Sequence, residues 1–201
     1  MRVTAGLLED SHPLFILVFA PRGAGFPPLS ERSSPVLPSE YLTQDHRRLD
    51  AVLTEAVAGG DIDRERYDAF RRGLLRHIAI EENIVMPLIR ERSENGFFAL
   101  QQIHLEHGAI AALLVPPPDD ELITVLRSLL EKHNLLEETQ NTLYDVLDHC
   151  ARTDQPELLE RLENHPETRL NPNINNPAGL DPARRAIQRA GYTWDRLLHE
   201  D

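Results

Sequence analysis

Residues 77–82, HIAIEE, and residues 133–138, HNLLEE, repeat one short pattern in which paired glutamates begin four residues after a histidine. A further histidine precedes each copy, His46 before the first and His107 before the second. A helix places residues i and i+4 on one face about 6 Å apart, so each copy offers an imidazole and a carboxylate to one site. The doubled pattern therefore predicts helices that gather four histidines and two carboxylates into a binuclear metal site.

The repeat extends into the residues around the histidines. Aligning His46 with His107 pairs Asp45 with Glu106 and pairs the apolar residues that follow, Leu49, Ala51 and Leu53 with Ile110, Ala112 and Leu114. Helical patterning alone produces much of this similarity, so the ligand positions are its informative part. We read the chain as one helix pair used twice, in which the first helix supplies a lone histidine and the second supplies a His/Glu pair.

Four amphipathic helices are expected between residue 39 and about residue 150, because apolar residues recur there with a period of about 3.6 residues. The first helix is expected to run from Ser39 as N-cap to Gly59-Gly60, and the second from Asp63 as N-cap to the Asn95-Gly96 turn. The third is expected to end at Pro116-Pro117-Pro118, and the fourth to run from Asp119 or Asp120 as N-cap to about Cys150. Pro87 falls late in the second helix and should bend it or loosen one turn, because proline has no N–H to donate.

These helices and their short connections predict an all-α fold, an up-down antiparallel four-helix bundle over residues 39–152. The proposed ligands lie within the apolar stripes, where a core would normally place leucine. The core of such a bundle is a standard place to assemble a metal site from facing helices.

Two segments flank the predicted bundle. Residues 1–38 hold six of the fifteen prolines and are interpreted as an irregular arm with one short strand at Phe15–Phe19. Residues 153–201 are interpreted as a partly helical tail, in which Asp181–Ala190 and Tyr192–Leu198 are the best-ordered pieces. Trp194, the single tryptophan, is expected to anchor this tail against the bundle.

Composition restricts the partners and the compartment. A formal charge of −12 disfavours nucleic acid and anionic membranes as partners. The longest apolar run, Leu14–Ala20, is far shorter than the roughly 20 residues that span a bilayer, so no transmembrane helix is expected. The single cysteine, Cys150, excludes an intramolecular disulfide and favours a reducing compartment, so a cytoplasmic protein is expected.

The donor set indicates which metals fit. Imidazole and carboxylate without thiolate suit iron, manganese or zinc, and they disfavour the cysteine-rich structural zinc sites. Burying these groups together without metal would be very costly, since unpaired buried carboxylates are heavily penalised.

The donor count also predicts an open coordination position. If each carboxylate bridges both ions and each ion takes two histidines, an oxo or hydroxo bridge leaves one open position per octahedral ion. Dioxygen or nitric oxide would bind there.

The order H, HxxxE, H, HxxxE over roughly residues 39–152, with the contexts Asp45-His46 and Glu106-His107, resembles the hemerythrin-like HHE cation-binding family. Ferritin-like bundles use Glu-x-x-His instead, and no histidine within the predicted bundle, residues 39–152, follows a glutamate at that spacing. The resemblance implies a non-haem di-iron centre with an Fe–O–Fe or hydroxo bridge. It implies as ligands His46, His77, Glu81, His107, His133 and Glu137.

The resemblance does not extend to the oxygen-carrying hemerythrins. Their site is expected to contain five histidines, including an HxxxH pair, and an HxxxxD carboxylate. Here Ile103 stands four residues before His107, and the fourth helix carries HxxxE. Dioxygen carriage is therefore not expected. Glu82, His104 and Glu138 lie off the ligand face, so a surface position is favoured for them. The alternative is a place in the second shell, where a carboxylate orients a histidine through its other nitrogen.

Three functions remain open from the sequence. The favoured one is a metal-binding protein that takes up dioxygen, nitric oxide or peroxide for sensing, stress response or iron handling, with a redox or signalling protein as its partner. The second is a di-iron oxidase or peroxidase, for which no general acid stands out. The third is an interaction protein that keeps its metal, for example zinc, for stability.

Overall fold

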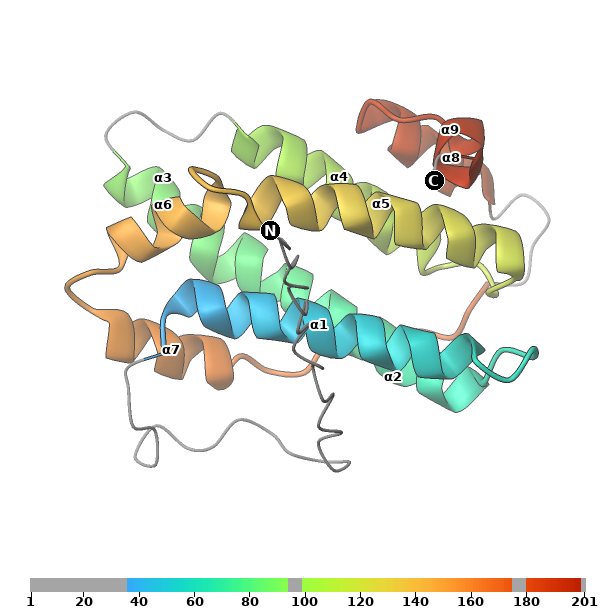
Figure 1. Ribbon diagram of the computed structural model, residues 1–201, viewed down its shortest axis with the longest axis horizontal. Helices are drawn as coiled ribbons and strands as arrows, with labels where there is room; N and C mark the ends of the chain where they lie inside the picture. The colour runs from blue at the N-terminus through green and yellow to red at the C-terminus, as the bar shows by residue number, and fades with distance from the viewer. Residues whose placement is uncertain (1–35, 94–98, 175–179, 200–201) are drawn as a thin grey trace, which may run out of the picture. The chain divides into compact units, whose positions relative to one another are not determined.

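The computed structural model describes residues 36–93, 99–174 and 180–199, and all regular secondary structure in these ranges is helical (Figure 1). The predicted all-α class is thus confirmed for this part of the chain. Residues 35–201 form one compact unit. The strand expected at Phe15–Phe19, the Asn95-Gly96 turn and nearly all of the arm at residues 1–38 lie outside the described residues.

Helix α1 spans Pro38–Val57 and begins slightly earlier than expected, because Pro38 occupies its first turn, where a missing N–H costs nothing. Ser39 does not cap this helix, so that prediction is wrong. Its hydroxyl instead donates to Asp148 Oδ2 at 2.5 Å, while Glu40 accepts the N–H of Leu37 at 3.2 Å. A carboxylate therefore satisfies the exposed helix end.

Helix α2, Arg64–Ile80, packs against α1 (Figure 1). The turn between them contains Gly60 with a φ of 84°, a conformation that glycine adopts without strain. Asp63 caps α2 as predicted and accepts the N–H groups of Glu65 and Arg66. The two helices that carry His46 and His77 are thus joined by a turn with standard capping chemistry.

One loosened turn follows α2. Residues Glu81–Val85 form a π-helical turn, η2, and Met86–Arg92 continue as α3. The N–H of Met86 bonds to the carbonyl of Glu81, five residues back, just before Pro87. Because proline cannot donate and its ring crowds the preceding turn, a wider turn relieves the conflict, as the sequence predicts. This turn carries both glutamates of the first HxxxEE pattern.

Helices α4, Ala99–Leu113, and α5, Asp120–Glu138, form the second contacting pair (Figure 1). Asp119 caps α5 by accepting the N–H of Leu122 at 2.8 Å. Asn173 from the tail donates to the carbonyls of Leu114 and Pro116, which the proline connector leaves outside a helix. The tail thereby helps to fix the α4–α5 connection.

The expected continuation of α5 to Cys150 is wrong. The helix ends at Glu138, and α6, Leu143–Cys150, starts after a turn in which Asn141 has a φ of 66°. The hydroxyls of Thr139 and Thr142 bond to the carbonyls of Leu135 and Glu137 at 2.5 and 2.7 Å. Such side chains compete with helical hydrogen bonds, and asparagine tolerates the left-handed conformation.

The tail contains α7, Gln155–Glu163, α8, Leu180–Arg189, and α9, Trp194–His199. Helix α8 packs on α4 and α9 packs on α5. Trp194 is buried and donates to Glu121 at 2.6 Å, so the predicted anchor is confirmed. The two predicted ordered pieces of the tail coincide closely with α8 and α9.

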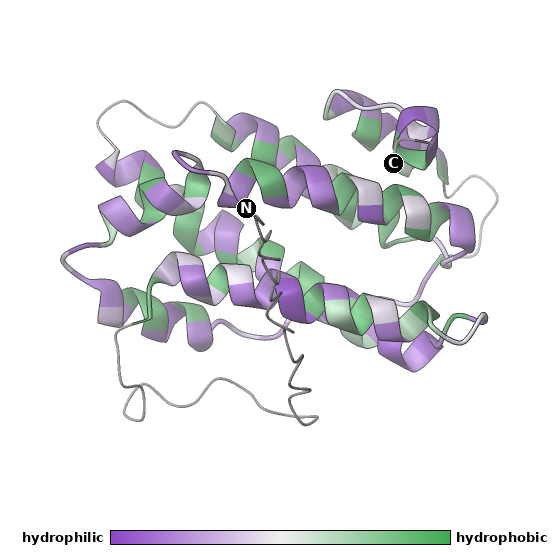
Figure 2. Ribbon diagram, viewed as in Figure 1, coloured by the Kyte–Doolittle hydropathy of each residue, from purple (hydrophilic) through white to green (hydrophobic). Residues whose placement is uncertain are grey.

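Apolar stripes of these helices face one core. Figure 2 shows hydrophobic and hydrophilic residues alternating along α1 and α5, as amphipathic helices require. One hydrophobic core cluster joins α1, α2, α4 and α5 to α8 and α9 of the tail, and it includes Leu53, Tyr67, Phe70, Ile110, Leu126, Ile187 and Trp194. Among the described residues, no helix is long and apolar enough to cross a membrane.

Candidate metal centre

The six predicted ligands come together in the interior as two overlapping clusters. Within each cluster the donor atoms lie within 4.8 Å of one another, and every member is buried. The first cluster is His46, His77, Glu81 and Glu137, and the second is Glu81, His107, His133 and Glu137. We call His46 and His77 the first half-site and His107 and His133 the second half-site.

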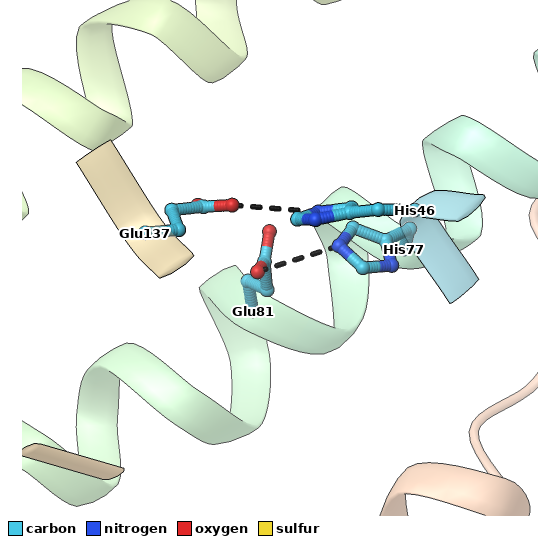
Figure 3. Close-up of side chains that lie close together, drawn as sticks. All are labelled: His46, His77, Glu81 and Glu137. Atoms are coloured by element: carbon cyan, nitrogen blue, oxygen red, sulfur yellow. Dashed lines mark ion pairs between the residues drawn. The ribbon is translucent and has the colours of Figure 1, made fainter. Parts of the chain in front are cut away.

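The first half-site is shown in Figure 3. His46 on α1 points its Nε2 at Glu137, with 3.4 Å between Nε2 and Oε2. His77 on α2 points its Nε2 at Glu81, four residues further along, again with 3.4 Å to the nearer oxygen, Oε1. The two imidazole rings lie against each other with centroids 4.4 Å apart.

The second half-site repeats this arrangement from α4 and α5. The Nε2 of His133 lies 3.2 Å from Glu137 Oε1, which is again the i+4 relation within one helix. The Nε2 of His107 lies 3.2 Å from Glu81 Oε2 and 3.6 Å from Glu137 Oε1. The ring centroids of the two histidines are 4.8 Å apart.

Glu81 and Glu137 are shared between the half-sites. Glu81 directs Oε1 toward His77 and Oε2 toward His107. Glu137 directs Oε2 toward His46 and Oε1 toward His133. Each carboxylate therefore presents one oxygen to each half-site, which is the orientation that a carboxylate bridging two cations needs.

Polar atoms of this centre are left without hydrogen-bond partners. Among the described residues, such buried side-chain atoms include His77 Nε2, Glu81 Oε2, His107 Nε2 and Glu137 Oε1. Unpaired buried polar atoms are rare and costly, and here four of them face one space. All four are atom types that bind metal, so the residues present fit a metal centre.

The buried carboxylates raise the pKa values of His77 and His133. Burial alone would lower the pKa of His77, but Glu81 and Asp45 raise it to about 10. Burial likewise lowers the pKa of His133, while Glu137 and Glu106 raise it to about 9. Without a metal ion, protons on the imidazoles compensate the carboxylates.

The shared carboxylates show the complementary shift. Burial and the neighbouring Glu81 raise the pKa of Glu137, but His133 and His107 outweigh them and hold it at about 2. Burial also raises the pKa of Glu81, yet His77 and His107 bring it well below its usual range. The site therefore keeps two buried negative charges that demand cations, either protons or metal ions.

Each histidine uses its Nδ1 to contact a carboxylate from another segment. The Nδ1 of His77 lies 3.0 Å from Asp45, and the Nδ1 of His133 lies 2.9 Å from Glu106. The other two carboxylates come from the second glutamate of each HxxxEE pattern. The distances are 2.6 Å from His46 Nδ1 to Glu138 Oε1 and 2.7 Å from His107 Nδ1 to Glu82 Oε1.

These four contacts close a ring around the helices. A carboxylate of α1 contacts the histidine of α2, the turn after α2 contacts α4, α4 contacts α5, and α5 contacts α1. Such partners fix the tautomer and orientation of an imidazole, so each Nε2 is aimed into the centre. We call Asp45, Glu82, Glu106 and Glu138 the outer carboxylates.

Sequence reasoning considered two of the outer carboxylates and missed the other two. It weighed Glu82 and Glu138, which are partly exposed and contact histidines, but not Asp45 and Glu106. The available signal was the acidic residue directly before each lone histidine. His104 is exposed and lies 2.9 Å from Glu82, outside the two clusters.

Two tyrosines that lie outside the repeat join the centre. Tyr144 on α6 donates to Glu81 Oε1 at 2.8 Å. Tyr192, between α8 and α9, donates to Glu106 Oε1 at 2.7 Å and was missed, because it lies far from the repeat along the chain. Tyr67 lies in the apolar core instead, and its hydroxyl has no hydrogen-bond partner among the described residues.

A cavity of about 310 Å³ reaches the centre between α1, α2 and α5. His46, His77 and His133 line its inner end, and its walls are mainly apolar, with Leu49, Leu53, Phe70, Leu74, Ile78 and Leu130. Asp50 and Arg127 also line it and pair with each other at 3.4 Å on the exposed side. A small, weakly polar molecule could therefore reach the histidines.

A family model described as the hemerythrin HHE cation binding domain matches residues 37–165. The chain belongs to this family. No curated protein and no solved structure matches the chain significantly. The HHE match includes both clusters and all four outer carboxylates, whereas Tyr192 and helices α8 and α9 lie beyond it. Cation binding is thus the shared property of the family, and the buried clusters are able to hold metal.

Proposed function

We propose that this HHE domain binds two iron ions through His46, His77, Glu81, His107, His133 and Glu137. The observation that carries the proposal is the sharing of Glu81 and Glu137, each of which offers one oxygen to each half-site. Two histidines and two carboxylate oxygens per ion suit iron, and manganese or zinc would find the same donors. The helices α1, α2 with its continuation η2, α4 and α5 carry these donors and would form the up-down antiparallel four-helix bundle.

Side chains around the centre would position the histidines for metal binding. The outer carboxylates hold each Nδ1, which leaves each Nε2 as the only free imidazole donor. Burial excludes bulk water and strengthens the attraction between the carboxylates and a cation. Bound iron would supply redox chemistry and an open coordination position for a small ligand.

We infer that dioxygen, nitric oxide or peroxide is that ligand, in sensing, stress response or iron handling. The cavity supports this, because its apolar walls suit small molecules of low polarity and its inner end is formed by three of the four histidines. Departure from the oxygen-carrier pattern at Ile103 argues against dioxygen transport. A redox or signalling protein would be the partner that responds to the oxidation or ligation state of the iron. The buried, free Cys150 fits a reducing compartment such as the cytoplasm.

Elemental analysis combined with absorption spectroscopy tests the proposal on freshly purified protein. We expect about two iron ions per chain, from the donor count. Anaerobic reduction followed by dioxygen or nitric oxide should change the visible spectrum. Full zinc occupancy after growth in iron-replete medium would instead support a structural metal. Turnover of peroxide above free-iron controls would support an enzyme.

A further inference from the structure

Tyr144 lies inside the first half-site rather than beside it. The side chain is buried, and its hydroxyl oxygen is close to three of the donor atoms of the first cluster. The distances are 2.8 Å to Glu81 Oε1, 3.2 Å to His46 Nε2 and 3.4 Å to Glu137 Oε2.

These distances are those between neighbouring ligands of one ion. Donors about 2.1 Å from a shared octahedral cation lie about 3.0 Å from each other along the edges of the octahedron. The contacts between His46 and Glu137 and between His77 and Glu81 are both 3.4 Å. The phenol oxygen of Tyr144 thus has the same spacing to the donors as the donors have to each other.

The chain reaches this position through the break after α5. In one continuous helix, Tyr144 would lie seven residues beyond Glu137, about 10 Å further along the axis. The turn at residues 139–142 ends α5, and α6 packs back against α1 and α5. The unexpected turn therefore delivers a phenol into the centre.

We propose that Tyr144 is a seventh protein ligand, which binds the ion of the first half-site through its phenol oxygen. This inference rests on the proposed two-ion centre. On binding, an oxygen–metal bond replaces the O–H bond, and the proton leaves to solvent. The second half-site receives no equivalent donor from Tyr192, whose hydroxyl contacts Glu106. The two ions are therefore chemically different, and the open position belongs to the ion at His107 and His133.

The test is the spectrum of the full chain loaded with ferric iron. A phenolate bound to ferric iron gives a charge-transfer band in the visible range, with phenolate ring vibrations in the resonance Raman spectrum. We expect both in the wild type and their complete loss in Tyr144→Phe. Tyr67→Phe is the matched control, because it removes another buried tyrosine hydroxyl that lies in the core.

The outcomes separate this inference from the proposed function. Iron bound in the wild type without phenolate vibrations would overturn the role of Tyr144 and leave the di-iron centre standing. A wild type that takes up no iron would overturn both. If Tyr144→Phe does not fold, replacing the tyrosines of the unmutated chain with 3-fluorotyrosine decides the question. A shifted charge-transfer band supports the phenolate, and an unchanged spectrum overturns it.

Discussion

The two half-sites are built from the same parts but are supported differently. In both, two histidines face the shared carboxylates through Nε2 and contact outer carboxylates through Nδ1. In the first half-site, the phenol oxygen of Tyr144 lies 3.2 Å from His46 Nε2, and Arg48 donates to the buried outer carboxylate Asp45 at 2.7 Å. In the second, Glu106 is held by Gln102 and by Tyr192 of the tail.

The two half-sites are thus equivalent in their histidines and shared carboxylates but differ in the residues that support them. The donors are equivalent because they come from a repeated sequence pattern. The supporting residues Tyr144 and Tyr192 lie on segments outside that pattern, so each half-site acquires its own neighbours. Variants that affect both half-sites, one half-site or one supporting residue should therefore give graded effects.

The largest effect is expected from Glu137→Gln, because this side chain faces both half-sites. Its amide keeps the shape but loses the charge and one oxygen donor. We expect the metal content to fall from about two ions per chain to about one or less, since one ion loses its oxygen donor and both ions lose the negative charge of the shared carboxylate. Elemental analysis after gel filtration measures this, with Glu138→Gln as the neighbouring control. Unchanged stoichiometry in Glu137→Gln would refute the shared role.

His77→Ala and His133→Ala should each damage one half-site. Each variant is expected to retain about one ion per chain, because both histidines of the other half-site remain together with the two shared carboxylates. In the metal-free protein, each should also lose about 3–5 kcal/mol of unfolding free energy, since a buried carboxylate loses its partner. Metal analysis and urea unfolding provide the measurements. Equal loss of both ions in both variants would mean that the half-sites do not bind separately.

Metal-free protein should lose stability as the pH rises. The folded-state pKa values of His77 and His133, about 10 and about 9, exceed the ordinary value of 6.5. Their contribution to stability is therefore fully present below pH 6.5 and disappears as the pH rises through 9 to 10. Urea unfolding after chelation should show this loss. The metal-loaded protein should show much less of it, and equal pH profiles would contradict the interpretation.

Outer carboxylates should have smaller effects. Asp45→Asn and Glu106→Gln should each weaken binding of one ion by about 10- to 100-fold, as removal of such partners typically does. The partly exposed Glu138 and Glu82 should matter less, because solvent screens their charge. Competition with a chromophoric chelator gives the affinities. A larger loss in Glu138→Gln than in Asp45→Asn would reverse this ranking.

The smallest effect is expected from Tyr192→Phe, which removes one hydrogen bond from Glu106. The cost should be about 1.5–3 kcal/mol of stability, the usual value for a bond to a charged acceptor. Weaker metal binding should be confined to the second half-site, so the charge-transfer band assigned to Tyr144 should persist. A loss of that band in Tyr192→Phe would show that the half-sites are coupled.

Much of the fold followed from local sequence signals. The caps at Asp63 and Asp119, the loosened turn before Pro87 and the tail helices α8 and α9 were predicted, because each depends on residues close together in the chain, whereas α7 was not predicted. The break at residues 139–142 was not predicted, since the apolar stripe continues through it to Leu147. The periodicity of apolar residues indicates which face of a helix is buried, and α5 and α6 both bury their apolar faces. It therefore does not reveal the break between them.

The sequence by itself determined the six candidate ligands, because the HxxxE spacing fixes a histidine and a glutamate on one helical face whatever the helix packs against, and the repeat adds one lone histidine to each pair. Only the tertiary structure decided which carboxylate supports which histidine. Asp45 precedes His46 yet contacts His77, and Glu106 precedes His107 yet contacts His133. Adjacent residues point about 100° apart around a helix, so such a side chain finds its partner on the neighbouring helix. The positions of Tyr144 and Tyr192 were likewise decided by the tertiary structure, since helix packing sets their distances to the centre.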